Sequence, residues 1–170
     1  MKNYIIGFIL FFLIACQEDR SAPAEDVVVD VEADIKSVVE GETYAYMEKD
    51  YQKWASYWDH GSDVLRLDIA DGVFAQASGW EKNGGKLESF FEEHPEPITS
   101  TFENSNYLIF HDDNLSWVAF DQTWTSEEGV VSVAKATITL IKKEGDWKII
   151  SYTAIQYDAE GDDVDTLGRE

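Results

Sequence analysis

A small set of acidic, imidazole and phenol side chains makes up the candidates for proton-transfer chemistry in this sequence. Desolvation raises the pKa of a carboxylic acid held in an apolar cavity, which suits general acid or base catalysis near neutral pH. The candidate acids and bases are Asp59, His60, Asp68, Asp71 and Asp121, with Tyr44 or Tyr57 as a hydrogen-bond donor. The Asp59-His60 pair also lies at the expected end of a helix, where the helix dipole alone favours a histidine. The residue types therefore permit acid–base catalysis without establishing it.

Charge and motifs exclude several other classes of function. The chain carries 34 Asp and Glu against 13 Lys and Arg, a net charge of −21, which repels nucleic acid and leaves no basic stripe to bind it. His111-Asp112-Asp113 and the acidic C-terminal residues have no EF-hand ligand order. A phosphate loop, a nucleophile elbow, a His-Glu zinc motif and Rossmann glycines are all missing from the sequence. We therefore expect no nucleic-acid partner, no metal site and no cofactor.

Residues 1–15 have the pattern of an export signal, in which Lys2 precedes an apolar run too short to span a bilayer comfortably. Leu13-Ile14-Ala15-Cys16 resembles the bacterial lipobox, and Cys16 is the single cysteine of the chain. The resemblance implies a lipoprotein signal peptide cleaved before Cys16 and acyl chains such as palmitate on that residue, which together give stable membrane anchoring. An ordinary signal peptide and a buried N-terminal helix are the alternatives.

The segments around the domain are acidic. Residues 16–28 are polar and contain Pro23, as expected of a flexible acidic tether. The Gln17-Glu18-Asp19 stretch resembles signals that export lipoproteins to the cell surface. We therefore expect a protein held in the cell envelope at the outer membrane, on its periplasmic side or at the cell surface. Residues 158–170 are expected to be an acidic, disordered tail.

Apolar periodicity predicts helices over 29–48 and 51–58, the second capped by Asp50 and ended by Gly61, with Glu42 assigned to the polar face of the first. A third helix is expected to begin near Asn83 or Gly84 and to stop before Pro95. Alternation predicts a strand over 63–69, followed by an irregular stretch over 70–79. β-Branched and aromatic residues between turn signals predict a long strand or a bent pair of strands over 98–110 and further strands over 115–126, 130–142 and 147–157. Helices combined with an antiparallel meander make an α+β domain.

This order of elements resembles the nuclear transport factor 2-like, SnoaL-like superfamily over residues 29–157. The resemblance rests on three motifs, which are Asp50-Tyr51 through Tyr57-Trp58, Gly79-Trp80 through Phe90-Phe91, and Gly145-Asp146-Trp147-Lys148-Ile149. It implies a cystatin-like fold, in which a curved antiparallel sheet forms a cone and three N-terminal helices pack on its concave face. No catalytic set of the superfamily maps onto this sequence.

The resemblance also implies a cavity at the mouth of the cone. Aromatic walls with a few polar groups are typical of small-molecule pockets. The aromatic candidates for the lining are Tyr57, Trp58, Phe74, Trp80, Phe90, Trp117 and Trp124. The alternative is that these rings fill the cone as hydrophobic core.

The leading functional hypothesis is a non-catalytic, membrane-anchored domain that binds a small apolar ligand or a protein partner. The alternative is an isomerase, lyase or hydrolase with a buried Asp or His as general base. A third reading is an interaction module that forms a homodimer through the exposed face of its sheet.

Overall fold

The computed structural model describes residues 30–70 and 72–157. The expected signal peptide over 1–15, the tether over 16–28 with Cys16, the catalytic candidate Asp71 and the acidic tail over 158–170 lie outside the described residues. Within the described ranges, no helix combines the length and the apolar character that a bilayer crossing requires.

Three helices form, and an aspartate side chain caps the start of the first two. Helix α1 spans Val31–Met47 and α2 spans Tyr51–Ser56. The Asp50 side chain accepts the backbone N–H of Lys53 at 3.0 Å, which confirms the predicted N-cap of α2. Helix α3 spans Trp80–Glu93 and begins earlier than predicted, because Gly79 at φ 81° ends the preceding extended stretch and the Trp80 N–H donates to Gly61 O at 3.0 Å.

Six strands form one sheet in the order β2-β1-β6-β5-β4-β3. The strands span Leu65–Ala70 (β1), Val73–Ser78 (β2), Thr101–His111 (β3), Leu115–Thr125 (β4), Val131–Lys143 (β5) and Asp146–Tyr157 (β6). β1 runs parallel to β6, and every other neighbouring pair is antiparallel. The register shifts between Ser105 and Leu108 in β3 and between Thr139 and Leu140 in β5, and such irregularities bend a sheet.

The expectation of an irregular stretch over 70–79 is wrong, because most of it is strand β2. Ala70 pairs with Val73, so only two residues connect β1 to β2. Gly72, the second of these, has φ 73°, a conformation that glycine adopts without strain. Asp-Gly between two short extended segments is a strong hairpin signal, and it was present in the sequence.

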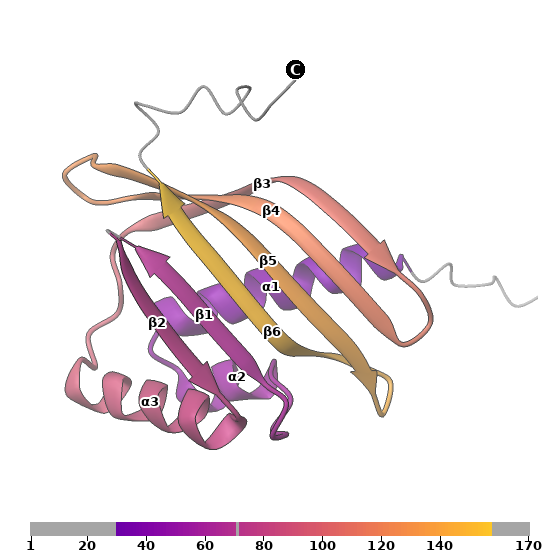
Figure 1. The fold of residues 1–170 in the computed structure, drawn as a ribbon. Coiled ribbons are helices and arrows are strands. Elements are labelled where there is room, and N and C mark those ends of the chain that lie inside the picture. The colour runs from indigo at the N-terminus through magenta and orange to yellow at the C-terminus, as the bar shows by residue number, and fades with distance from the viewer. Residues whose placement is uncertain (1–29, 71, 158–170) are drawn as a thin grey trace, which may run out of the picture.

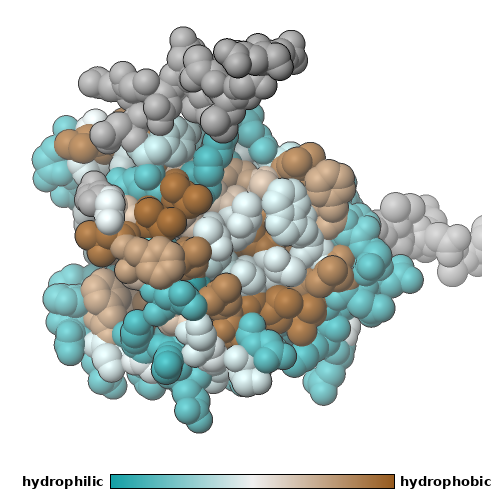
Figure 2. Space-filling model, viewed as in Figure 1, coloured by the Kyte–Doolittle hydropathy of each residue, from teal (hydrophilic) through white to brown (hydrophobic). Residues whose placement is uncertain are grey.

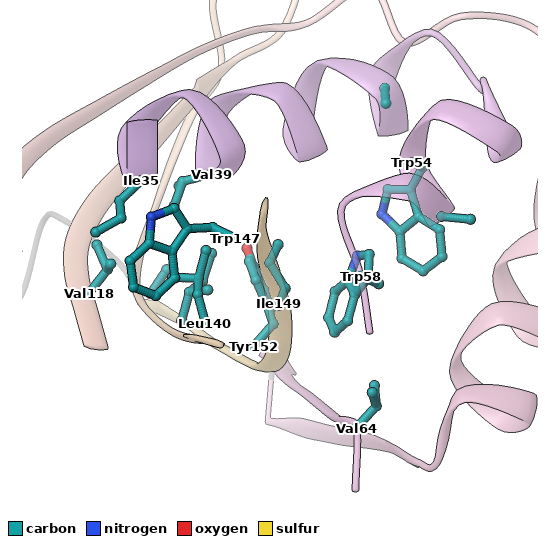
Figure 3. Close-up of a cluster of buried hydrophobic side chains, with 14 of the residues drawn as sticks. Ile35, Val39, Trp54, Trp58, Val64, Val118, Leu140, Trp147, Ile149 and Tyr152 are labelled. Carbon is teal, nitrogen blue, oxygen red and sulfur yellow. The ribbon is translucent and has the colours of Figure 1, made fainter. Parts of the chain in front are cut away.

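The helices cover the concave face of the sheet, and α1 crosses behind it in the view of Figure 1. Ile35 and Val39 on α1 point toward Leu140 and Trp147 on the sheet (Figure 3), and all four side chains are buried. Along β4 the buried residues alternate with more exposed ones, as expected for a sheet with one face on the core. Trp54 on α2 extends the same core together with Trp58, which follows the end of α2, and the two ring centroids are 5.4 Å apart. The predicted helix over 51–58 is therefore two residues too long, because Trp58 pairs with Ile149 of β6 instead.

Candidate functional site

A cavity of about 370 Å³ lies between α1 and the inner face of the sheet. Its walls come from α1, β1, β4, β5 and β6 and from Ile98, which precedes β3. Much of the lining is apolar or aromatic, including Tyr46, Ile98, Trp124 and Ala154. Its charged residues lie on two elements, with Glu42 on α1 and Arg66 and Asp68 on β1.

Glu42 is the most deeply buried of these ionisable side chains. Its Oε1 accepts the indole N–H of Trp54 at 2.6 Å and that of Trp58 at 3.4 Å. Burial raises the pKa of the Glu42 carboxyl above its usual range, although the charge of Arg66 and the two indole hydrogen bonds act in the opposite direction. No described residue donates a hydrogen bond to Oε2, so this oxygen is available to a molecule in the cavity.

Arg66 joins the two carboxylates. Its Nε and Nη2 donate to the two carboxylate oxygens of Asp68 at 3.0 and 3.4 Å, and its Nη1 donates to Glu42 Oε1 at 3.5 Å. The Arg66 guanidinium also lies 4.7 Å from the centroid of the Tyr152 ring. The pKa of Arg66 is raised because Asp68 and Glu42 outweigh the effect of burial, so the guanidinium stays charged. One cation between two carboxylates leaves this part of the cavity net negative when Glu42 is ionised.

Further polar groups line the cavity around this cluster. Burial raises the pKa of the Tyr46 and Tyr152 hydroxyls, so both remain protonated donors near neutral pH. The Trp124 indole N–H donates to Gln122 Oε1 at 2.8 Å, and Gln122 Nε2 donates to Asn104 Oδ1 at 3.1 Å. These bonds fix the Trp124 ring against the cavity.

Among the candidate acids and bases, the structure brings Asp68 to the cavity. Asp121 pairs with Lys135 and accepts from Asn106 at 2.7 Å; despite partial burial, these contacts lower its pKa. Asp59 pairs with Lys143, and there too the pKa is lowered despite some burial. His60 stacks on Trp80 with ring centroids 3.9 Å apart and contacts Ala55 O at 3.0 Å. Of these four residues, Asp68 lines the cavity, so His60, Asp59 and Asp121 are not placed to act on a molecule held there.

The hydrogen-bond donors proposed with them also lie outside the cavity. Tyr57 borders an outer groove beside Trp147, and Tyr44 is 52% exposed. Tyr46 and Tyr152 are the tyrosines that line the cavity within the described residues.

The aromatic candidates for the lining are divided among three places. Trp124 lines the cavity. Trp58, Trp80 and Phe90 pack among the helices, and Trp58 contributes its indole N–H to Glu42. The expectation that Phe74 and Trp117 line the cavity is wrong, because Phe74 is 61% exposed on β2 and Trp117 alternates with buried Val118 and is 38% exposed on the outer face of the sheet. Core packing therefore accounts for more of these rings than a ligand pocket does.

Sequence reasoning missed Glu42 and Arg66. Glu42 was assigned to the polar face of the first helix, yet it follows Ile35 and Val39 at the spacing of a buried stripe. This position on the apolar stripe could have identified Glu42 as a buried residue, because a buried acid needs hydrogen-bond donors around it. Arg66 belongs to the predicted strand over 63–69, but its pairing with Glu42 depends on how α1 crosses the sheet.

Neither models of protein families nor curated protein sequences match this chain. Solved structures do match it in fold. A protein of unknown function with a cystatin-like fold from Nostoc punctiforme is 13% identical with a TM-score of 0.61, over 75% of this chain and 92% of that one. An NTF2-like protein of unknown function from Pseudomonas putida is 15% identical with a TM-score of 0.61, over 76% of this chain and 89% of that one. A candidate dehydratase of the NTF2-like family from Streptomyces avermitilis is 13% identical with a TM-score of 0.58, over 75% of this chain and 96% of that one.

These likenesses agree with the architecture described above, a curved six-stranded sheet with helices on its concave face. At such low sequence identity they speak for the fold and leave the chemistry to the site itself. The chain therefore contains an α+β domain of the nuclear transport factor 2-like, cystatin-like fold.

Proposed function

We propose that this domain binds a small, largely apolar molecule in the cavity between α1 and the curved sheet, called the cone cavity or the cone below, with a polar group of that molecule beside Glu42, Arg66 and Asp68. The observation that carries the proposal is the cavity of about 370 Å³, which combines apolar walls with a cluster of ionisable groups. Its volume falls within the range of roughly 300–1,000 Å³ that is usual for ligand pockets. Arg66 and the tyrosine hydroxyls offer donors, and Glu42 Oε2 offers an acceptor.

Tryptophan fluorescence tests this proposal because Trp124 lines the cavity while Trp117 lies on the outer face. A panel of apolar ligands should include molecules that change the fluorescence and raise the melting temperature. Trp124→Phe should remove most of the fluorescence change, and Trp117→Phe, the matched control, should leave it in place. The absence of any fluorescence change and of any thermal shift across the panel would contradict the proposal.

A second candidate function is acid–base catalysis in the same cavity, as in an isomerase, lyase or hydrolase. It is favoured by Glu42, whose raised pKa and free Oε2 suit a general acid or base, with Asp68 beside it. Small cyclic ketones dissolved in D₂O provide the probe, because a base in the cavity would exchange the protons next to the carbonyl. Exchange that is lost in both Glu42→Gln and Asp68→Asn would support catalysis. Exchange no faster than in buffer alone would contradict the catalytic function.

The lipobox supports membrane anchoring of this domain through acylated Cys16, in the cell envelope at the outer membrane, on its periplasmic side or at the cell surface. Detergent phase partition tests the anchor. The wild-type chain should enter the detergent phase, and Cys16→Ala should move to the aqueous phase. A Cys16→Ala chain that stays with the detergent would contradict the assignment.

The outer face of the sheet supports a homodimer. Neighbouring rows across β4, β5 and β6 carry uncharged side chains, for example Trp117 beside Thr139 and Ala119 beside Thr137. Figure 2 shows pale and brown residues across the middle of this face and teal residues around its margin. In a chain of net charge −21, such a face lets two copies meet with little like-charge repulsion. Light scattering should show that the wild-type chain is a dimer and that the Trp117→Lys variant is a monomer. A monomeric wild-type chain would refute the proposed dimer.

A further inference from the structure

A second hollow, of about 150 Å³, lies between α3 and the β1–β2 hairpin. Figure 1 shows α3 beside these two strands, at the edge of the sheet. Arg66 and Asp68 line both this hollow and the cone cavity, so their ion pair stands between the two. The other residues that line the hollow do not line the cone cavity, so the two spaces present different groups to a bound molecule.

Asn83 on α3 supplies a buried donor without an acceptor. Its side chain is 3% exposed and lines the hollow. Its Nδ2 has no hydrogen-bond partner among the described residues. Buried amide groups in folded proteins are nearly always paired, so an unpaired one beside a hollow points to an acceptor that the domain itself does not provide.

The neighbouring groups are also donors. Lys86 follows Asn83 by three residues and therefore lies on the same side of α3, where its Nζ donates to Gln76 O on β2 at 3.3 Å. Both carboxylate oxygens of Asp68 already accept from Arg66. Arg66 is already paired with Asp68 and Glu42, so the ammonium of Lys86, whose described partner is a backbone carbonyl, is the positive charge that this hollow can offer to an anion.

We propose that this hollow is a binding subsite for the carboxylate of a small monocarboxylic acid. The carboxylate accepts from Asn83 Nδ2 and from the Lys86 ammonium, and the short alkyl part lies against Leu87 and Ala75. The volume limits the occupant to a short-chain acid. This subsite goes beyond the proposed function of the cone, because it takes an anion at donors that do not border the cone cavity.

Titration of the ¹⁵N-labelled full chain in mild detergent with butyrate tests the subsite by NMR. Butyrate should shift the side-chain NH₂ signals of Asn83 in a saturable manner, and butanol, which has the same chain without the carboxylate, should not. Lys86→Gln should weaken butyrate binding by about tenfold, because it removes the ammonium donor from a charge-assisted hydrogen bond. Lys82→Gln removes the same charge from an exposed position of α3 that does not line the hollow, and it should change affinity by less than about twofold.

Three results would overturn the subsite. They are Asn83 signals that do not shift, butanol that shifts them as much as butyrate does, and a Lys82→Gln variant as weak as Lys86→Gln. The indole N–H signal of Trp124 in the same spectra reports on the cone. A shift of Trp124 without a shift of Asn83 would refute the subsite and leave the proposed function of the cone standing.

Discussion

Replacing Glu42 by Gln and, in parallel, by Met isolates the value of its buried oxygen. Both variants remove the charge and keep the length of the side chain, but only Gln keeps an acceptor for the indole N–H groups of Trp54 and Trp58. A buried donor left without a partner costs about 1–3 kcal/mol. On that scale, loss of the 2.6 Å hydrogen bond from Trp54 costs about 2 kcal/mol, and loss of the 3.4 Å hydrogen bond from Trp58 costs about 1 kcal/mol.

The two losses add to about 3 kcal/mol, and the greater apolarity of Met offsets about 1 kcal/mol of this. Glu42→Met should therefore be less stable than Glu42→Gln by about 2 kcal/mol, a shift of about 1 M in the urea midpoint at an m value of about 2 kcal/mol/M. Urea unfolding at pH 7, followed by tryptophan fluorescence, measures this difference.

Glu32 supplies the matched control, because it lies on the same helix and is exposed. Glu32→Met and Glu32→Gln should differ by less than about 0.5 kcal/mol. Equal midpoints for Glu42→Met and Glu42→Gln would show that the indole hydrogen bonds do not contribute to stability and would refute the reasoning.

Two further predictions concern pH and packing. Burial raises the folded-state pKa of Glu42 above its ordinary 4.5. Between these two pKa values the folded chain therefore binds more protons than the unfolded chain. The contribution of Glu42 to stability is full below pH 4.5 and is lost as pH rises through the folded-state pKa. Denaturant titrations from pH 4 upward should show Glu42→Gln gaining stability relative to wild type as pH rises, and a constant difference would contradict the shift. At Gly84, a Cβ would lie 2.8 Å from Trp80 Cζ2 and 3.1 Å from Tyr51 Oη. Gly84→Ala should therefore destabilise the domain by about 1–3 kcal/mol in thermal unfolding, although Ala has the better helix propensity. Gly85→Ala is the control and should not destabilise the domain, because a Cβ at Gly85 meets nothing within 4 Å. A more stable Gly84→Ala variant would show that the contact relaxes freely.

Local signals in the sequence were sufficient for most of the architecture. Asp50 capped α2 as predicted, Pro95 follows the end of α3, and the turns around Asp113, Glu128 and Gly145 separate the long strands where the pattern placed them. These features depend on residues close together in the chain, so a single sequence carries them. The Asp-Gly connection between β1 and β2 is an equally local signal, but the Ala and Gly residues nearby favour the prediction of an irregular stretch.

The candidate site was harder to predict because its parts come from distant segments. Arg66 contacts Glu42 although the two residues are 24 positions apart in the sequence. Which side of each strand faces the core depends on how the sheet curves over α1. Asp59 and His60 were reasonable candidates by residue type, but they follow α2 on the side of Lys143 and Trp80, away from the cone. Trp117 is a candidate for the lining by residue type, but the alternation of β4 places it on the outer face, since the next residue, Val118, is buried on the inner face.

A crystal structure of the full chain, purified without refolding, tests the central claim most directly. The account predicts bound density in the cone, with an apolar part against Trp124 and a polar atom within hydrogen-bond distance of Arg66 or Glu42 Oε2. A cone filled by its own side chains, or one that holds ordered water alone even after soaking with ligands from the fluorescence panel, would contradict it.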